Sequence, residues 1–462
     1  MMNWNSLFTQ ERHGTGTITR DSRSEFQRDF DRLIFSSGLR RMQNKTQVFP
    51  LPGIAFVHNR LTHSLEVASV GRSLGKIVGN YIVNTFGKDF NYEETTFYLH
   101  ELSHVIAAAC LAHDIGNPPF GHSGEKAISK YFIDNKDTFI EGRNRLRDYF
   151  DTIFWDEFLK FEGNANGLRY LTHSFNGKVP GGLRLTYTTL ASMLKYPCPV
   201  NGIDNNFKHR SKFNFFQSEK NVFKKTCEKT NMLLESNNPL LFKRHPFVYL
   251  TEAADDICYK LIDIEDAQRL KIIDSNTVIS LLLNLIKCLK VHDFRRVEES
   301  FDKIKDTNDK VSYLRAKCIN ALTVVCADRF MENSHEIING LFNDELISIV
   351  NKQCSEMKEI TKVTKQQIYN HPKVMKIELA GYQILYDLLA LFVPAVLKHS
   401  PTHMDTKLKK IIPNQFMYDE SIANISNYEK VFSVLDFLSG MTDEYALQLY
   451  KQLKGIEINT HD

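Results

Sequence analysis

Residues that interrupt helices are scarce in this sequence, which has 22 glycines and 13 prolines among 462 residues. That is below their usual combined share of about 12%. So few breakers over this length exclude a collagen-like or loop-dominated chain and favour helices. The length is compatible with two or three domains or with one large helical body. Either could bury a core without disulfides or structural metals.

An excess of charge of one sign is also absent. The 58 Lys and Arg residues nearly balance the 55 Asp and Glu residues, for a net charge of +3. The isoelectric point near 8.2 is below the value of about 9 that is typical of dedicated nucleic-acid binders. Residues 1–13 contain no apolar signal core, and the most apolar stretch, 384–397, is short and contains Asp387. We therefore expect a soluble, cytoplasmic protein without a membrane partner.

Closely paired cysteines are lacking as well. The eight cysteines are dispersed along the chain and form no C-x-x-C pair. Such usage predicts reduced, mostly buried thiols, as in cytoplasmic proteins.

Apolar residues follow a helical period through most of the chain. Their spacing predicts helices within 22–45, from Thr62 onward, over about 99–111 and over 247–270, and further helical stripes up to the C-terminus. Two prolines and a glycine within 50–53 predict a loop.

One segment departs from this helical pattern. Glycine and proline at 177–182, next to L-R-L-T-Y-T-T-L, predict a small β-ribbon. The sequence therefore predicts an all-α fold with one minor β-ribbon.

Four candidate metal ligands occur in three distinctive fragments. R-L-T-H at 60–63, A-H-D-I-G-N-P-P-F-G-H-S-G-E at 112–125 and E-A-A-D-D-I-C-Y-K-L-I-D at 252–263 supply His63, His113, Asp114 and Asp255. Two imidazoles and two carboxylates form a mixed set that suits a divalent metal with open positions for water or phosphate. An isolated His–Asp pair is more often a structural hydrogen bond, but the complete set favours a metal site.

Helical geometry sorts the neighbours of Asp255. Asp255, Tyr259, Asp263 and Asp266 lie within about 80° of arc on one face of a helix. Asp256 points about 100° away from Asp255 and is the less favoured ligand.

The turn after the second fragment adds a charged pair, His122 and Glu125, three residues apart. His122 could protonate a leaving oxygen or orient a water molecule. Glu125 could fix the tautomer of His122 and raise its basicity. Gly116 and Gly121 would let the backbone turn tightly between Asp114 and His122.

Taken together, these fragments resemble the HD-domain phosphohydrolase superfamily. More narrowly, L-R-R-M-Q-N-K-T-Q-V-F-P, N-R-L-T-H-S-L-E-V-A, F-E-G-N-A-N-G-L-R and L-T-Y-T-T-L-A-S-M-L-K-Y-P are similar to deoxyguanosine triphosphate triphosphohydrolases. The resemblance covers roughly residues 20–270. It implies an N-terminal arm over 1–20, an HD-domain helical core over 21–270, and a helical C-terminal region over 271–462 packed on that core.

The resemblance also implies a reaction and a cofactor. A dNTP and water would give a deoxynucleoside and intact tripolyphosphate, through attack of water on the α-phosphorus. The four candidate ligands would hold one divalent ion, Mg²⁺ or Mn²⁺, and His122 and Glu125 would be the catalytic pair. Only the family name favours dGTP among the dNTPs.

Substrate contacts follow from the same resemblance. The family holds the sugar 3′-hydroxyl with a Gln, a Tyr and an Asp, which correspond here to Gln47, Tyr259 and Asp263. The shared helix face of Tyr259 and Asp263 agrees with this assignment. The tyrosine ring would crowd a 2′-hydroxyl and so favour deoxynucleotides.

The triphosphate requires converging cations. Arg60, one helical turn before the first candidate ligand, is the first choice. Lys195 and Tyr196 in L-K-Y-P correspond to the phosphate-contacting pair of the family. Asn164 and Arg169 in E-G-N-A-N-G-L-R are weaker candidates.

Two other classes of function stay open. The same site could serve a 5′-deoxynucleotidase or another HD phosphohydrolase. Alternatively, the protein could be a non-catalytic nucleotide sensor or a single-stranded nucleic-acid-binding protein, because basic residues over 208–229 alternate with Phe213, Phe215 and Phe216. A helix with a buried aromatic stripe is the more common origin of that pattern.

The resemblance further implies a homo-oligomer, either a hexamer or a tetramer. It also allows for a dNTP as allosteric effector and for single-stranded DNA as a partner.

Overall fold

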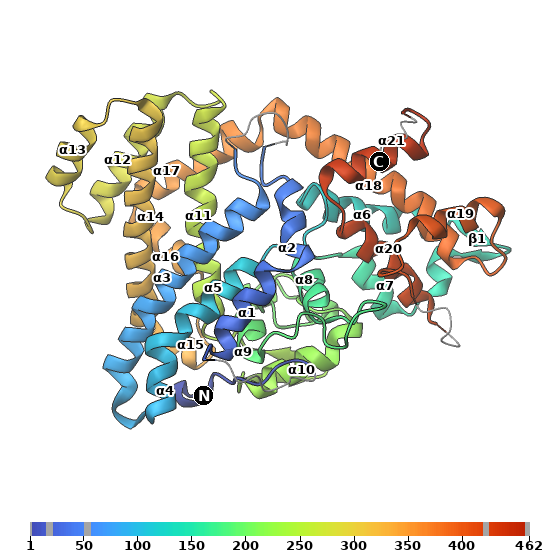
Figure 1. Cartoon of the computed structure of the whole chain (residues 1–462), viewed down its shortest axis with the longest axis horizontal. Helices are drawn as coiled ribbons and strands as arrows, with labels where there is room; N and C mark the ends of the chain where they lie inside the picture. Colours follow the sequence, from blue (N-terminus) through green and yellow to red (C-terminus); the bar gives the residue numbers. More distant parts are fainter. Residues whose placement is uncertain (1, 15–21, 50–56, 419–424, 458–462) are drawn as a thin grey trace.

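The computed structural model describes residues 2–14, 22–49, 57–418 and 425–457. Helices make up most of these residues, and the strands among them form two short ribbons (Figure 1). The prediction of an all-α fold with a helical C-terminal extension is confirmed.

One part of the molecule is organised around three helices, α3 (Arg60–Phe86), α5 (Leu102–Ala112) and α11 (Val248–Arg269). α1 (Glu25–Ile34) packs on α5, while α14 (Thr307–Glu332) packs on α3 and α11. Their apolar side chains belong to one hydrophobic cluster. This cluster supports the ends of α3, α5 and α11 that carry the predicted metal ligands.

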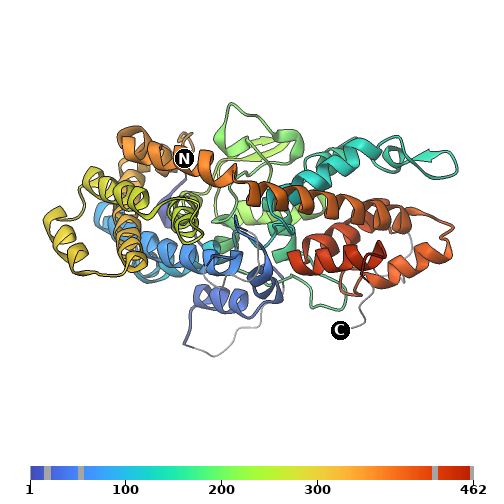
Figure 2. The same ribbon diagram turned by 90° about the horizontal axis from the view of Figure 1, so that it is seen from above.

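A second hydrophobic cluster is centred on α18 (Pro372–Leu397). α6 (His122–Asn135), α19 (His403–Ile411), α20 (Asn427–Ser439) and α21 (Asp443–Leu453) pack against this helix. Figure 2 shows α18 running lengthwise through the molecule. The first turns of α18 belong to the first cluster and the later turns to the second, so this helix connects the two.

Shorter helices complete the two clusters. Residues 22–45 contain two α-helices rather than one, because Ser36 caps the second and its hydroxyl accepts the N–H of Leu39. The other α-helices of the described residues are α2 (Ser37–Arg41), α4 (Tyr92–Thr96), α7 (Thr152–Leu159), α8 (Gly163–Thr172), α9 (Tyr187–Ala191), α10 (Lys220–Lys229), α12 (Ser275–Leu289), α13 (Phe294–Lys303), α15 (Ser334–Ile338), α16 (Leu346–Gln353) and α17 (Ser355–Val363).

A row of glycines lets α3 approach α5 closely. Residues four positions apart form a row along α3 that begins with His63 and Val67 and continues with Gly71, Gly75 and Gly79. A methyl group at Gly75 would lie 2.8 Å from the Cα of Ser103 just inside α5. The short separation of the two helices brings His63 close to the C-terminal end of α5.

The predicted ribbon is misplaced. β1 (Phe139–Glu141) pairs antiparallel with β2 (Asn144–Arg145), and β3 (Leu234–Asn237) pairs antiparallel with β4 (Leu240–Phe242). Residues 177–185, where the ribbon was expected, contain turns and bends but no strand, and Thr186 forms only an isolated antiparallel β-bridge with Arg12. The side chain of Thr186 accepts the N–H of Thr189 and starts α9, so the apparent strand pattern is a helix cap.

The apolar stretch near residue 390 is part of a longer helix than expected. α18 has 26 residues and, by length and composition alone, could cross a membrane. Half of its most apolar window is buried inside the protein, and Leu385, Leu388 and Phe392 are fully buried. This burial is typical of a core helix in a soluble protein.

The expectation of uniformly reduced cysteines is wrong for one pair. Cys288 at the end of α12 and Cys354 before α17 form a disulfide. The pairing was not predictable, because 66 residues separate the two cysteines in the sequence. The other six cysteines are free and buried, as expected.

Within the predicted N-terminal arm, residues 2–14 pack against the first cluster, where Met2, Trp4 and Leu7 are buried. The hydroxyl of Tyr98 donates to the carbonyl oxygen of Trp4. The predicted loop at residues 50–53 lies outside the described residues, and the predicted domain boundaries stay predictions.

Candidate active site

Two histidines and one aspartate from three segments meet at one point. His63 lies in the first turn of α3, His113 directly follows α5, and Asp255 lies in α11. Oδ1 of Asp255 is 3.1 Å from Nε2 of His63 and 3.4 Å from Nε2 of His113. One potential ligand atom from each residue lies within 4.8 Å of the other two. This spacing is suited to a single ion bound by all three residues.

The hydrogen bonding of His113 leaves one nitrogen available at this point. Nδ1 lies 2.6 Å from the carbonyl oxygen of Cys110, which assigns the proton of the neutral ring to Nδ1. Nε2 is buried and has no hydrogen-bond partner among the described residues. An unpartnered imidazole nitrogen beside carboxylates fits a divalent cation.

Without a cation, the site instead favours a proton on His113. Burial lowers the pKa of His113, but the charges of Asp114 and Asp255 outweigh this effect and raise it to about 9. A cation must therefore compete with a proton for this imidazole.

Asp114, the fourth predicted ligand, lies beside this group rather than within it. Its Oδ1 is 3.6 Å from Nε2 of His113 and accepts a hydrogen bond from Asn117. Its Oδ2 forms an ion pair with Arg60. Burial opposes ionisation of Asp114, but Arg60 and His113 lower its pKa to about 2. Asp114 is therefore an anion next to the cluster, and its role as a ligand stays a prediction.

Lys195 faces the other oxygen of Asp255. Its Nζ is 3.4 Å from Oδ2 of Asp255. Despite burial, His113 and Lys195 hold the pKa of Asp255 well below its usual range, and Asp255 in turn raises the pKa of Lys195. Arg60 and Lys195, the two cations predicted to bind phosphate, thus both contact carboxylates of the predicted metal site.

His122 and Glu125 form a hydrogen-bonded pair in the first turn of α6. Nδ1 of His122 lies 2.7 Å from Oε2 of Glu125, and Oε1 of Glu125 accepts the N–H of Gly163 at 2.8 Å. The His122 side chain is 79% exposed and that of Glu125 only 11%. The bond to Glu125 raises the pKa of His122; burial would raise the pKa of Glu125, but His122 lowers it. The pair therefore presents a fixed imidazole with a raised proton affinity.

The turn that leads to His122 contains two residues in the left-handed region. φ is 60° at Phe120 and 56° at Gly121. Glycine adopts this conformation readily, whereas a residue with a side chain adopts it at a cost of about 1–2 kcal/mol. The predicted tight turn at Gly121 is therefore confirmed, and Phe120 adds strain to it.

One cavity of about 590 Å³ brings these groups together. The predicted site residues that line it are Gln47, Arg60, His113, Asp114, His122, Glu125, Asn164, Lys195, Tyr196, Asp255 and Tyr259. Lys126 and Lys212 add two further cations to the lining, and Asp256 adds a carboxylate. The predicted catalytic pair, part of the metal cluster and most of the predicted substrate contacts therefore share one space.

The predicted sugar contacts are only partly open to this cavity. Oε1 of Gln47 is buried without a hydrogen-bond partner among the described residues. The ring of Tyr259 stacks 6.0 Å from that of Tyr369, which also lines the cavity. Asp263 is buried, and its Oδ2 accepts the hydroxyl of Tyr369 at 2.6 Å. Burial raises the pKa of Asp263 to about 7.

Asn164 and Tyr196 are held in the cavity wall by neighbours that the sequence did not single out. Asn164 donates to Oε1 of Glu162 at 2.6 Å, and Nζ of Lys212 lies 2.9 Å from Oε2 of Glu162. Asn214 accepts the N–H of Tyr196 and donates to the carbonyl oxygen of Asn164. These bonds fix this part of the cavity wall, and although Glu162 lies in the fragment F-E-G-N-A-N-G-L-R, its partnership with Lys212 could not be predicted from that fragment.

The basic and aromatic stretch at 208–229 does not form the stacking surface that the single-stranded nucleic-acid alternative would require. Phe213, Phe215 and Phe216 are at most 1% exposed, so their rings cannot stack on nucleic-acid bases. Lys212 from the same stretch faces the cavity instead.

Arg169 is not placed in the cavity. Its guanidinium lies 2.7 Å from Asp436 and 2.9 Å from Glu219, over the ring of Phe432. The residue is buried and does not line the cavity. The predicted phosphate contact is therefore corrected: Arg169 connects α8 to α20 and has its charge balanced by two carboxylates.

Comparison with known proteins supports a single family. The HD domain matches residues 60–193, and the phosphohydrolase-associated domain matches residues 347–452. A deoxyguanosinetriphosphate triphosphohydrolase-like protein from Synechocystis is 35% identical over 466 residues, which cover 99% of this chain and 100% of the relative.

Two further relatives agree. A Pseudomonas aeruginosa protein with the same description is 35% identical over 461 residues, covering 98% of this chain and 99% of the relative. A deoxyguanosinetriphosphate triphosphohydrolase from Yersinia pestis is 31% identical over 497 residues, covering 94% of each. The chain belongs to the dGTPase family of HD-domain phosphohydrolases.

As a member of the dGTPase family, the protein is a phosphohydrolase enzyme. The matched HD segment carries His63, His113, Asp114 and the His122–Glu125 pair, whereas Asp255 lies outside both matched segments. The fold therefore completes the candidate metal-binding cluster with a residue that follows the HD segment by more than sixty positions.

We expect Mn²⁺ affinity to increase with pH. His113 is protonated below its raised pKa of about 9, so binding a cation there must release its proton. Release of one proton makes the apparent affinity rise about tenfold per pH unit below pH 9. Isothermal titration calorimetry from pH 6.5 to 8.5, in buffers of different ionisation enthalpy, measures both the slope and the proton release.

His113→Ala should bind Mn²⁺ at least about tenfold more weakly, whereas His122→Ala should retain wild-type affinity. An affinity independent of pH, or equal in wild type and His113→Ala, would contradict this assignment of the site.

Proposed function

We propose that this protein is a metal-dependent deoxynucleoside triphosphate triphosphohydrolase that prefers dGTP. The observation that carries the proposal is the shared cavity, in which the metal-ligand cluster and the His122–Glu125 pair face a lining with four Lys and Arg residues. The names of the relatives, deoxyguanosinetriphosphate triphosphohydrolase and triphosphohydrolase-like protein, support the same substrate.

His63, His113 and Asp255 would hold the divalent ion, Mg²⁺ or Mn²⁺, with Asp114 beside them as the fourth ligand. Such an ion would supply Lewis-acid polarisation of the phosphate and would help to orient the attacking water. The chain's own contribution is to hold two imidazoles and two carboxylates in one place.

His122 is the proposed proton donor. The hydrogen bond to Glu125 raises the pKa of His122 and so favours the protonated imidazole, and Glu125 holds the ring through Nδ1. Nε2 is then the nitrogen that can donate to the leaving 5′-oxygen of the deoxynucleoside. Glu125 is itself fixed by the N–H of Gly163, so the orientation of the ring is set before substrate binds.

Four cations in one cavity favour a triphosphate over a monophosphate. Arg60, Lys126, Lys195 and Lys212 line the same space, and the hydroxyl of Tyr196 can add a hydrogen bond. A triphosphate has enough anionic oxygens to contact all four cations, whereas a monophosphate can contact only some of them, which argues against a 5′-deoxynucleotidase.

The sugar would lie between Gln47 and Tyr259. The unpartnered Oε1 of Gln47 can accept the 3′-hydroxyl, and the Tyr259 ring would crowd a ribose 2′-hydroxyl. Asp263 would support this wall through its hydrogen bond to Tyr369.

Glu378 supports the preference for guanine. It lies on the cavity lining in the first turns of α18, with no ion pair or hydrogen bond to any residue in the described part of the chain. Guanine is the base whose pairing edge offers two adjacent donors, N1–H and the 2-amino group, to one carboxylate. A carboxylate on the lining that contacts the base would therefore select for dGTP.

For the whole protein we propose a cytoplasmic homo-oligomer, a hexamer or tetramer, with a dNTP as allosteric effector. Residues 21–270 would form the core of each subunit and residues 271–462 its C-terminal region. Single-stranded DNA stays an untested partner, and the burial of Phe213, Phe215 and Phe216 removes the stacking surface that favoured it.

Product analysis tests the reaction. Purified protein with Mg²⁺ or Mn²⁺ should convert dGTP, alone or with a second dNTP, into deoxyguanosine and intact tripolyphosphate, separated by anion-exchange chromatography. His122→Ala should lower kcat about 10²–10⁴-fold while its bound metal, measured by mass spectrometry, is unchanged. Release of orthophosphate would instead assign a nucleotidase, and absence of turnover with every dNTP pair would favour the sensor.

Glu378→Gln should reduce the discrimination between dGTP and dATP, because the amide retains one acceptor and places a donor against guanine. We expect the ratio of the two kcat/KM values to fall about tenfold. Lys376→Gln, a neighbour on α18 that does not line the cavity, is the matched control and should leave the ratio unchanged. An unchanged ratio in Glu378→Gln would remove this residue from base recognition.

A further inference from the structure

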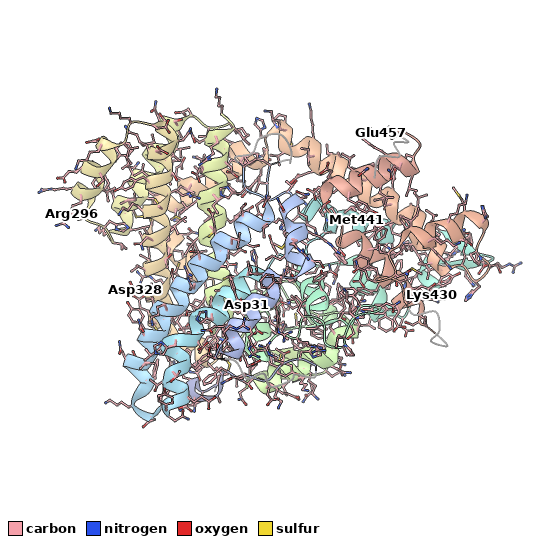
Figure 3. The ribbon with its side chains drawn as sticks, viewed as in Figure 1. Asp31, Arg296, Asp328, Lys430, Met441 and Glu457 are labelled. Atoms are coloured by element: carbon pink, nitrogen blue, oxygen red, sulfur yellow. A yellow bond between two sulfur atoms is a disulfide. The ribbon has the colours of Figure 1, made fainter. Side chains whose placement is uncertain are left out.

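The corner between α20 and α21 contacts the active-site turn directly. This corner, residues 439–443, belongs to the C-terminal helices, and its Met441 is buried in the second hydrophobic cluster (Figure 3). Two of its residues, Ser439 and Asp443, bond to segments that lie more than 300 positions earlier in the chain.

Asp443 accepts hydrogen bonds from two of these segments. Oδ1 accepts the N–H of Phe120 at 2.9 Å, and Oδ2 accepts the N–H of Thr46 at 2.8 Å. The residue is 7% exposed, so neither bond is easily replaced by water. One carboxylate therefore joins the turn before His122 to the segment that precedes Gln47.

Lys45 makes the complementary connection. Its Nζ donates to the carbonyl oxygen of Ser439 at 2.8 Å and to that of Asn117 at 2.7 Å. Ser439 is the last residue of α20, where the helix dipole favours a cation. The side chain is buried, and no carboxylate within the described ranges forms an ion pair with it. This ammonium group is thus held by backbone carbonyls from the corner and from the active-site turn.

The segments that the corner contacts lie next to residues of the proposed active site. The side chain of Asn117 donates to Asp114, and Phe120 lies two residues before His122. Thr46 forms a β-bridge with Asn59, which caps the helix that carries Arg60 and His63. The corner and its partner Lys45 therefore connect two stretches of backbone near the candidate metal ligands. One is residues 117–120, which follow His113 and Asp114, and the other is residues 45–46, which lie beside the start of α3.

From these contacts we propose that Asp443 and Lys45 are positioning residues, through which the C-terminal helices hold the active-site turn in its catalytic conformation. This inference rests on the proposed hydrolysis of dNTPs. It gives the phosphohydrolase-associated segment, residues 347–452, a role in the reaction although His63, His113, Asp114 and Asp255 all lie outside that segment.

The strain at Phe120 explains why such a support is needed. Phe120 is held at a φ of 60°, a conformation that a residue with a side chain leaves unless its surroundings oppose the change. Its N–H is bound by Asp443, and its ring packs against Gly381 of α18, where a Cβ would overlap it. Loss of the carboxylate would free the turn to relax and would move His122 relative to the metal ligands.

The test uses Asp443→Asn and Asp443→Ala in the full-length protein. Asn preserves the shape but removes one acceptor, so it should fold even where Ala does not. Hydrogen exchange followed by mass spectrometry should show backbone amides of residues 116–125 exchanging at least about tenfold faster than in wild type. kcat for dGTP should fall about 10–100-fold with KM changed less than about threefold, because Lys195 and Lys212, two of the proposed phosphate contacts, lie on segments that Asp443 does not contact.

The pH profile distinguishes positioning from a general loss of structure. A displaced His122 no longer keeps its contact with Glu125, so the limb of kcat that reports His122 should shift to lower pH in Asp443→Asn. Lys45→Met should produce the same changes in exchange and in kcat. Asp405→Asn is the matched control, because Asp405 is equally buried in the C-terminal helices but bonds only to Lys398 and Thr402.

The two proposals can fail separately. If wild-type protein hydrolyses no dNTP, the proposed function fails, and hydrogen exchange alone still tests the contact between corner and turn. If folded Asp443→Asn shows wild-type exchange at 116–125, or faster exchange with unchanged kcat, the positioning role is overturned.

Discussion

The structure depends above all on one carboxylate, Asp255, which three other segments approach. His63 from α3, His113 from the end of α5 and Lys195 from the loop after α9 all lie within 3.4 Å of its oxygens. The side chain of Asp255 is only 24% exposed, and neighbouring cations or a metal offset the cost of withdrawing such a charge from water. α3, α5 and α11 pack together beside the cavity, and this packing brings His63 and His113 to Asp255.

The two halves of the molecule contribute unequal parts of the site. The first hydrophobic cluster fixes the metal ligands, since the close approach of α3 to α5 depends on the glycine row that includes Gly71, Gly75 and Gly79. The second cluster fixes α6, and with it His122 and Glu125. α18 joins both clusters and lines the cavity with its first turns. How the two clusters are joined therefore sets the position of the candidate metal ligands relative to the His122–Glu125 pair.

Local patterns predicted the parts of the site that lie within single fragments. His63, His113 and Asp255 each occur in a distinctive fragment, and their convergence followed from the residue types that one metal needs. Tyr369 could not be predicted, because it reaches Asp263 from 106 positions away. Arg169 was misassigned because its motif does not reveal that Asp436 and Glu219 balance its charge. The ribbon was misplaced because Thr186 can cap a helix as readily as it can join a strand.

The proposed metal-binding site is tested most directly by anomalous diffraction from crystals of the protein grown with Mn²⁺. If His63, His113 and Asp255 bind the metal, one strong manganese peak should lie within bonding distance of Nε2 of His63, Nε2 of His113 and Oδ1 of Asp255. This peak should be absent from crystals of His113→Ala grown under the same conditions. A peak elsewhere in the molecule, or no peak at this point at saturating Mn²⁺, would contradict the assignment of the metal-binding site.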